Sequence, residues 1–211
     1  MVYILYESSF QGKKILVFDL DGTIVKLKVN WQELKSILNR RYSKIYNESC
    51  EFQSISECLS FIVAKDDNEE LHNFFDIIKK FEIKKIENNI PIDQTIELIK
   101  NKEEFGIDKD AKLAILSLNS RNTIKNSLEQ EDILKNFDFI VGREDVRRWK
   151  PEPEGLIIIK NHFKVENDEM LYIGDMKKDL ITGKNAGIEA YLIDDLIEFV
   201  NKKKNSQKNH I

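Results

Sequence analysis

The chain has 211 residues, of which 41% are hydrophobic and 33% charged, and its formal net charge is −4. This length suits one domain, or one core domain with a small insert, and the near balance of charge excludes the basic surface typical of nucleic-acid-binding proteins. No apolar run approaches the roughly 20 residues of a membrane helix, and the apolar start is too short for a signal peptide core. We therefore expect a cytoplasmic enzyme or binding protein without nucleic-acid or membrane partners.

Short apolar runs in chain order predict five buried β-strands. They lie at residues 14–19, 113–117, 137–141, 170–174 and 190–193. The runs are continuous rather than alternating, which is typical of strands that are covered on both faces. Amphipathic stretches separate the later runs, at residues 122–131, 154–161 and 179–186. Strands that alternate with helices predict an α/β fold, with a parallel sheet flanked by helices.

The block 28–88 has a different pattern, with no strand-like run and neither glycine nor proline. Apolar residues recur there at helical spacing: Trp31, Leu34, Ile37 and Leu38, then Leu71, Phe74, Phe75, Ile78 and Phe81. We expect an all-helical insert, with a discontinuous core made of residues 1–27 and 89–200. Residues 1–12 would add an edge strand or pack as an arm. Residues 201–211 lack an apolar pattern, and we expect a disordered tail there.

The first strand runs directly into two acidic residues. The sequence ILVFDLDGT spans Ile15–Thr23, with Asp19 at the end of the strand and Asp21 two residues later. In an open parallel sheet, ligands bind beyond the carboxyl ends of the strands. An extended chain places both carboxylates on one side, where they repel each other and need a cation or a shared proton. A turn in which an aspartate caps a helix is the alternative.

Three later strands also end in polar residues. Ser117 ends the second strand, Lys150 stands before Pro151 after the third, and Asp175 and Asp179 follow the fourth in the sequence GDMKKD. If a helix begins there, these two aspartates share one face because they are four residues apart. Each feature alone is ordinary, as a capping hydroxyl, a surface lysine or a helix start. Together, at the ends of four successive strands, they predict one shared site.

These motifs resemble those of the haloacid dehalogenase-like hydrolase superfamily, in its phosphoglycolate phosphatase-like branch. They are DLDGT, Ser117, Lys150-Pro151 and GDMKKD, and the resemblance spans about residues 13 to 195. It implies a Rossmann-like core, with residues 28–88 as a small helical cap that closes over the pocket and selects the substrate. It also implies a phosphoric monoester hydrolase that acts on a small phosphorylated metabolite, as a monomer or a homodimer. Hinges are expected near residues 25–28 and 88–91.

The resemblance further implies the catalytic roles and the metal. Asp19 would be the nucleophile, and Asp21 the general acid and base. Asp19, Asp175 and the backbone carbonyl of Asp21 would bind Mg²⁺, and Asp179 would act as an outer ligand or orient the water around the metal. In this family the dehalogenases attack carbon and use neither such an acid nor a metal. Asp21 therefore favours phosphoryl transfer.

The remaining expectations concern phosphate binding and the open alternatives. Ser117 and Lys150 would hold the phosphoryl oxygens, and Asn119 would either help them or cap its loop. Arg121 and Arg143 are expected on the solvated surface, with contact to an anionic substrate as the alternative. A phosphomutase acting on a sugar phosphate and a catalytically inactive binding protein remain open. Phosphoglycolate, a sugar phosphate, a nucleoside monophosphate and pyrophosphate all remain candidate substrates.

Overall fold

A computed structural model describes residues 4–48, 51–84 and 86–208. Its core is a five-stranded sheet in the order β5-β4-β1-β6-β7, and all four pairs of neighbouring strands are parallel. The strands are β1 (Ile15–Phe18), β4 (Lys112–Leu116), β5 (Phe139–Val141), β6 (Met170–Gly174) and β7 (Glu189–Leu192). Ile15 pairs with Lys112 on one side and with Met170 on the other, so β1 is central. The α/β fold expected from the five apolar runs is confirmed.

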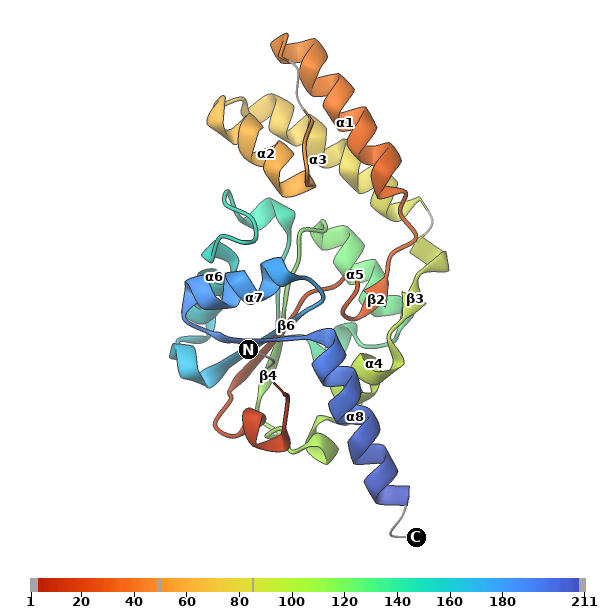
Figure 1. The fold of residues 1–211 in the computed structure, drawn as a ribbon, viewed down its shortest axis with the longest axis vertical. Coiled ribbons are helices and arrows are strands. Elements are labelled where there is room, and N and C mark those ends of the chain that lie inside the picture. The colour runs from red at the N-terminus through yellow and green to blue at the C-terminus, as the bar shows by residue number, and fades with distance from the viewer. Residues whose placement is uncertain (1–3, 49–50, 85, 209–211) are drawn as a thin grey trace.

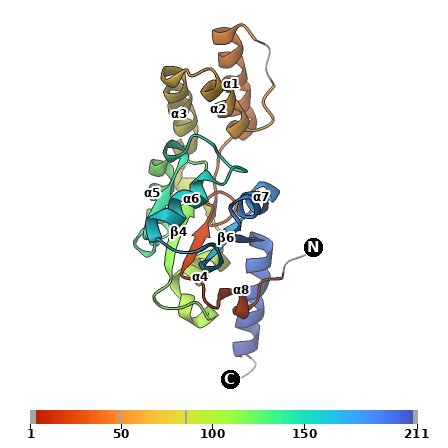
Figure 2. The same cartoon turned by 90° about the vertical axis from the view of Figure 1, so that its left-hand side faces the viewer.

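Both faces of the sheet are covered by helices (Figure 2). Successive β1 side chains point to opposite faces. Leu16 and Phe18 pack into a cluster with residues of α4 (Asp93–Lys100), α5 (Arg121–Gln130) and α8 (Ile193–Lys208). Ile15 and Val17 pack on the other face, with residues of α6 (Glu154–Phe163) and α7 (Lys177–Ala186). This double burial explains why the strands read as continuous apolar runs.

The expected helical insert follows β1 and stands over one end of the sheet (Figure 1). It consists of α1 (Trp31–Tyr46), α2 (Ile55–Ala64) and α3 (Asn68–Ile83). Each helix begins after a side-chain cap, because Asn30, Ser54 and Asp67 each accept a hydrogen bond from the amide three residues later. The two connections to the core lie side by side as an antiparallel ribbon, formed by β2 (Val25–Lys26) and β3 (Ile90–Pro91).

The two ends of the described chain pack on the core. Residues 201–208 were expected in a disordered tail, but they continue helix α8, so that expectation is wrong there; residues 209–211 lie outside the described residues. Lys204, in the second half of α8, forms an ion pair with Glu97 of α4 at 2.5 Å. This part of the helix is therefore also attached to the core. Near the other end, Phe10 is buried against Phe199, so the N-terminal segment is an arm. Within the described residues, no helix is long and apolar enough to cross a membrane.

Candidate active site

The sheet order brings the predicted residues to one edge. Asp19, Ser117 and Asp175 directly follow β1, β4 and β6, and these three strands are neighbours with β1 in the middle. The chain crosses from one side of β1 to the other between β5 and β6, so this edge is a topological switch point, where open α/β sheets bind ligands. The Asp19 amide still donates to the Ile173 carbonyl at 2.9 Å, which fixes Asp19 at the end of the sheet.

The loop after β1 holds the second aspartate near the insert. Gly22 has a φ of +80°, and a Cβ atom there would lie 2.3 Å from Asp175 Oδ2, so only glycine allows this turn to approach Asp175 so closely. Directly before this glycine, Asp21 accepts a hydrogen bond through its Oδ1 from the Leu27 amide at 2.8 Å. Asp21 is therefore tied to the segment that leads into the helical insert.

Lys150 lies at the centre of a buried charged cluster. Its Nζ donates to Asp19 Oδ2 at 2.6 Å, to Asp179 Oδ1 at 2.7 Å and to the Tyr172 hydroxyl at 3.0 Å. These bonds use all three ammonium protons. Burial lowers the pKa of the Lys150 ammonium, but the two carboxylates outweigh it and hold this pKa above its usual value. Burial likewise acts to raise the pKa of Asp179, yet Lys150 holds it below the ordinary value.

The carboxylates outnumber the lysine at this edge. One oxygen from each of Asp19, Asp175 and Asp179 lies within 4.8 Å of the others. Burial, and then the charges of Asp19 and Asp179, raise the pKa of Asp175 to about 6. Burial is also the main cause that raises the pKa of Asp21 to about 6. Clustered carboxylate oxygens with excess negative charge are the donor set that a hard divalent cation such as Mg²⁺ prefers. The residues present therefore fit the expected metal.

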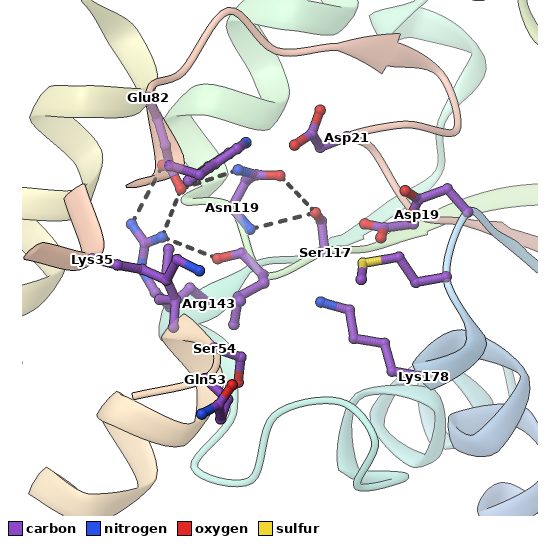
Figure 3. Close-up of a pocket in the computed structure, with 15 residues that line it drawn as sticks. Asp19, Asp21, Lys35, Gln53, Ser54, Glu82, Ser117, Asn119, Arg143 and Lys178 are labelled. Carbon is purple, nitrogen blue, oxygen red and sulfur yellow. Dashed lines mark hydrogen bonds and ion pairs between the residues drawn. The ribbon is translucent and has the colours of Figure 1, made fainter. Parts of the chain in front are cut away.

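A cavity of about 220 Å³ separates this edge from the insert (Figure 3). Of the predicted residues, it is lined by Asp19, Asp21, Ser117, Asn119 and Asp175. Lys150 and Asp179, although described and close by, are not among its lining residues. The insert contributes Trp31, Lys35, Ser54 and Glu82 to the opposite wall. The cavity is thus built jointly from the core and the helical insert.

Comparison with known proteins places the chain in a family. The family model for haloacid dehalogenase-like hydrolases matches residues 16–193. The chain belongs to this family. The pyrophosphatase PpaX of Halalkalibacterium halodurans is 27% identical over 182 residues, which cover 84% of this chain and 82% of that relative. The family expected from the four motifs is therefore confirmed, and the chain is an enzyme of the hydrolase class.

Solved structures of haloacid dehalogenase-like hydrolases share the fold. A putative phosphoglycolate phosphatase from Lactobacillus plantarum has a TM-score of 0.60 and 15% identity, with 88% of each chain covered. CbbY from Rhodobacter sphaeroides, in complex with phosphate, has a TM-score of 0.57 and 15% identity, with 85% of each chain covered. At these identities the likeness concerns the fold alone.

The two arginines have different surroundings in this hydrolase. Arg121 is half exposed and pairs with Asp145 at 2.5 Å, as a surface arginine would. Arg143, which was expected on the solvated surface, is only 1% exposed, so that expectation is wrong. The reason is a partner that the sequence does not announce, because Glu82 of α3 lies 2.7 Å from Arg143 Nη1. A tertiary ion pair compensates the cost of burying the guanidinium.

Tyr172 and Glu82 are among the residues of this site that were not predicted from the sequence. Tyr172 reads as an ordinary member of an apolar run, and nothing in its local sequence indicates the hydroxyl contact with Lys150. Glu82 did leave a signal. It continues the helical spacing of Leu71, Phe74 and Ile78, which are all buried, so a carboxylate stands where the pattern calls for an apolar side chain. A charged residue on a buried helix face needs a partner.

Proposed function

We propose that the protein is a Mg²⁺-dependent phosphatase that hydrolyses a small phosphomonoester through an aspartyl-phosphate intermediate. The observation that carries this proposal is the position of Asp19, which lines the cavity while its Oδ2 is held 2.6 Å from the buried Lys150 ammonium. Its other oxygen, Oδ1, accepts from the Leu20 amide at 2.7 Å. The carboxylate is thus oriented by two donors, as a nucleophile must be. The pyrophosphatase PpaX, and a phosphoglycolate phosphatase of Salmonella paratyphi A that is 37% identical over 60 residues, are both named for hydrolysis at phosphorus, which supports this proposal.

In the first step, a carboxylate oxygen of Asp19 attacks the phosphorus atom and the bond from phosphorus to the ester oxygen breaks. Asp21 gives its proton to the leaving oxygen, so an alcohol departs. The pKa of Asp21, raised to about 6 mainly by burial, keeps a fraction of its carboxyl group protonated near neutral pH. Asp21 lines the same cavity as Asp19, which gives it access to the ester oxygen.

In the second step, water attacks the phosphorus atom of the aspartyl-phosphate. Asp21, now a carboxylate, takes a proton from this water, and the bond from phosphorus to the Asp19 oxygen breaks. Inorganic phosphate leaves, and both aspartates return to their starting states. A phosphomutase would use the same residues but keep water away from the intermediate.

Phosphate binding falls to residues at the ends of β4 and β5. The Ser117 hydroxyl donates to Asn119 Oδ1 at 2.9 Å, and we propose that it turns from Asn119 to a phosphoryl oxygen when substrate binds. Lys150 is already saturated by Asp19, Asp179 and Tyr172, so we assign it mainly an electrostatic role. Its charge offsets the repulsion between the nucleophile and the phosphate.

Asp19 and Asp175, with the backbone carbonyl of Asp21, would hold Mg²⁺, and Asp179 would act as an outer ligand or orient the water around the metal. When bound, the cation supplies the positive charge that lets a carboxylate approach a phosphate dianion. Asp175 suits this role because it lines the cavity. Burial, and then the charges of Asp19 and Asp179, raise its pKa to about 6, and a cation would offset both effects.

The cavity also favours a substrate with a second anionic group. Lys35 of α1 and Lys178 of α7 both line it, and their side chains extend toward it from opposite sides (Figure 3). Within the described part of the chain, no ion pair involves either lysine. We therefore propose a small phosphate ester that carries a carboxylate or a second phosphate, as phosphoglycolate does.

The test is phosphate release from p-nitrophenyl phosphate and a panel of small phosphate esters, with Mg²⁺ and with EDTA. We expect Mg²⁺-dependent release by the wild type and none by Asp19→Asn. Asp76→Asn, at an exposed position on α3, is the matched control and should retain full activity. If folded wild-type protein with Mg²⁺ releases phosphate from no ester, the proposal is wrong, and a pyrophosphatase, a phosphomutase or a binding protein becomes the better interpretation.

A further inference from the structure

Glu82 joins the helical insert to the core at a buried point. It lies in the last turn of α3 and is 2% exposed. Its carboxylate accepts hydrogen bonds from four core residues: Asn119 Nδ2 at 3.0 Å, the Ser120 amide at 3.2 Å, Thr123 Oγ1 at 2.8 Å and Arg143 Nη1 at 2.7 Å. Three of these donors belong to the segment that begins just after Ser117. One insert side chain therefore fixes the loop at the end of β4.

The Arg143 partner extends this junction to the end of β5. Its guanidinium also donates to the Leu118 carbonyl at 3.0 Å and lies 5.4 Å from the Phe75 ring of α3. Its own carbonyl accepts from Trp149 Nε1 at 3.0 Å, and Trp149 directly precedes Lys150. The residues around the ion pair thus reach both segments that carry the proposed phosphate-binding groups.

The contact with Asn119 also determines which way its amide faces. A carboxylate can only accept hydrogen bonds, so the amide nitrogen of Asn119 must face Glu82. The amide oxygen then faces Ser117 and accepts its hydroxyl at 2.9 Å, as Figure 3 shows. Glu82, Asn119 and Ser117 therefore form a continuous chain of hydrogen bonds from the insert to the cavity.

We propose that Glu82 is a positioning residue that couples the seating of the helical insert to the order of the phosphate-binding loop at Ser117. The inference rests on the proposed function, because it takes Ser117 as a phosphate ligand. Its consequence is reciprocal: an insert that is seated on the core strengthens phosphate binding, and bound phosphate strengthens the seating of the insert.

A second ion pair on the same helix provides the control. Glu70, also in α3 and 7% exposed, forms two hydrogen bonds with Arg41 of α1, one of them to Nη2 at 2.8 Å. That pair lies entirely within the insert. A merely structural role for buried glutamates on α3 would make the two pairs equivalent, whereas our proposal assigns an effect on phosphate only to Glu82.

The experiment compares two double variants, Glu82→Leu/Arg143→Met and Glu70→Leu/Arg41→Met. Each removes both charges, so neither leaves a lone buried ion, which is the change that most destabilises a fold. We measure the dissociation constant of inorganic phosphate by titration calorimetry with Mg²⁺ present, and KM and kcat for p-nitrophenyl phosphate. We expect the first variant to bind phosphate about tenfold more weakly, as for the loss of one hydrogen bond to a charged group, with KM rising more than kcat falls. The second should bind phosphate as the wild type does.

Asn119→Ala tests whether the effect passes through the proposed chain of hydrogen bonds. Added to Glu82→Leu/Arg143→Met, it should weaken phosphate binding no further, since residues that act through one another are not additive. Full additivity overturns the proposed route. Equal phosphate affinity in the wild type and in the Glu82 double variant overturns the proposal itself.

A measurement on the wild type covers the case in which a variant does not fold. Hydrogen exchange of the Ser120 amide, which donates to Glu82, should slow by about tenfold when phosphate and Mg²⁺ are added, by the reciprocity above. Phosphate binding without this slowing contradicts the coupling. Calorimetry and hydrogen exchange measure phosphate binding and do not require turnover. If the wild type binds phosphate but hydrolyses no ester, the proposed function is refuted, and these two measurements still test the coupling. A wild type that binds no phosphate overturns the coupling, and phosphate release from the esters then decides the proposed function separately.

Discussion

Two buried charged clusters lie on either side of the cavity, and they differ in their balance of charge. Around Lys150, one ammonium faces the carboxylates of Asp19 and Asp179, with Asp175 close by. Around Glu82, one carboxylate faces one guanidinium and three further donors. The first cluster carries excess negative charge, whereas the second is neutral and its carboxylate is fully hydrogen-bonded.

The pKa values express the same difference. In the first cluster, burial and the charges of Asp19 and Asp179 raise the pKa of Asp175 to about 6. In the second, burial also acts to raise the pKa of Glu82, but Arg143 and the hydrogen bonds outweigh it and hold this pKa below its ordinary value. A buried carboxylate keeps a raised pKa when no counter-charge offsets its burial, and it can then bind a cation or a proton. A carboxylate with a lowered pKa is already satisfied, and it serves to fix structure.

The largest expected effect comes from removing Lys150 from the cluster with excess negative charge (Lys150, Asp19, Asp175 and Asp179), here called the unbalanced cluster. Lys150→Met leaves Asp19 and the fully buried Asp179 without their counter-charge, and breaking a buried pair in this way costs roughly 3–5 kcal/mol of unfolding free energy. We also expect kcat to fall by about 10²-fold or more, as for the loss of one electrostatic group in an active site. Urea unfolding and phosphate release measure the two effects.

Added Mg²⁺ should restore part of the lost stability in Lys150→Met, because a cation replaces the missing charge. The matched control is Lys13→Met. Lys13 is also buried and pairs with Glu189 at 2.9 Å, but it lies outside the cavity. This variant should keep its kcat, and Mg²⁺ should stabilise it no more than the wild type. If both variants lose the same kcat and gain the same stability from Mg²⁺, the cluster around Lys150 has no special role in catalysis or cation binding.

The neutral cluster around Glu82 and Arg143, here called the balanced cluster, should make the stability of the protein depend on pH. The pKa of Glu82 is lower in the folded state than its ordinary value of 4.5, so its contribution is fully present above pH 4.5 and is lost as the pH falls through the folded pKa. Glu82→Gln leaves Arg143 buried without a counter-charge. We expect it to reduce the free energy of unfolding by about 3 kcal/mol at pH 7.

Below pH 4.5 this deficit should shrink, because Glu82 of the unfolded wild type then binds a proton while the folded state stays charged, which favours unfolding of the wild type. Denaturant unfolding of both proteins from pH 7 to pH 3.5 measures it. Glu70→Gln serves as the control for a glutamate paired within the insert. A deficit that stays constant across this range would mean that the ionisation of Glu82 does not stabilise the junction.

The same contrast explains what could be predicted from the sequence. The strands and their polar ends are local features, since a strand buried on both faces reads as an apolar run and the motif residues directly follow it. Asp19, Ser117 and Asp175 could therefore be placed at one edge before the structure was known. The ion pair of Glu82 with Arg143 joins residues 61 positions apart, on α3 and on a short 3-10 helix after β5, and neither local sequence contains a motif. Only the spacing of Glu82 within an apolar helix face pointed to it.

Helix α8 shows a second limit of sequence patterns. Its buried residues, Ile193, Leu196, Phe199 and Val200, occupy the first half, and the Lys-rich second half has no apolar spacing. The helix nevertheless continues, because lysine and glutamine favour helices and Lys204 is held by Glu97 of another helix. The polar composition of residues 201–208 indicated a disordered tail, whereas the ion pair of Lys204 with Glu97 supports a helix there.

The smallest expected effect concerns Lys35 and Lys178 on the cavity wall. It tests whether the charges of these lysines help to select the substrate. Phosphoglycolate and 2-hydroxyethyl phosphate differ only in that a carboxylate replaces a hydroxymethyl group. If Lys35 and Lys178 receive this carboxylate, each change to Met should raise KM for phosphoglycolate by about three- to fivefold, the scale of a partly exposed ion pair. KM for 2-hydroxyethyl phosphate should not change, since that ester has no second anion. Lys80→Met, at an exposed position of α3, should affect neither ester. A similar rise in KM for both esters would place the lysines at the transferred phosphoryl group instead, and no rise for either would remove them from substrate recognition.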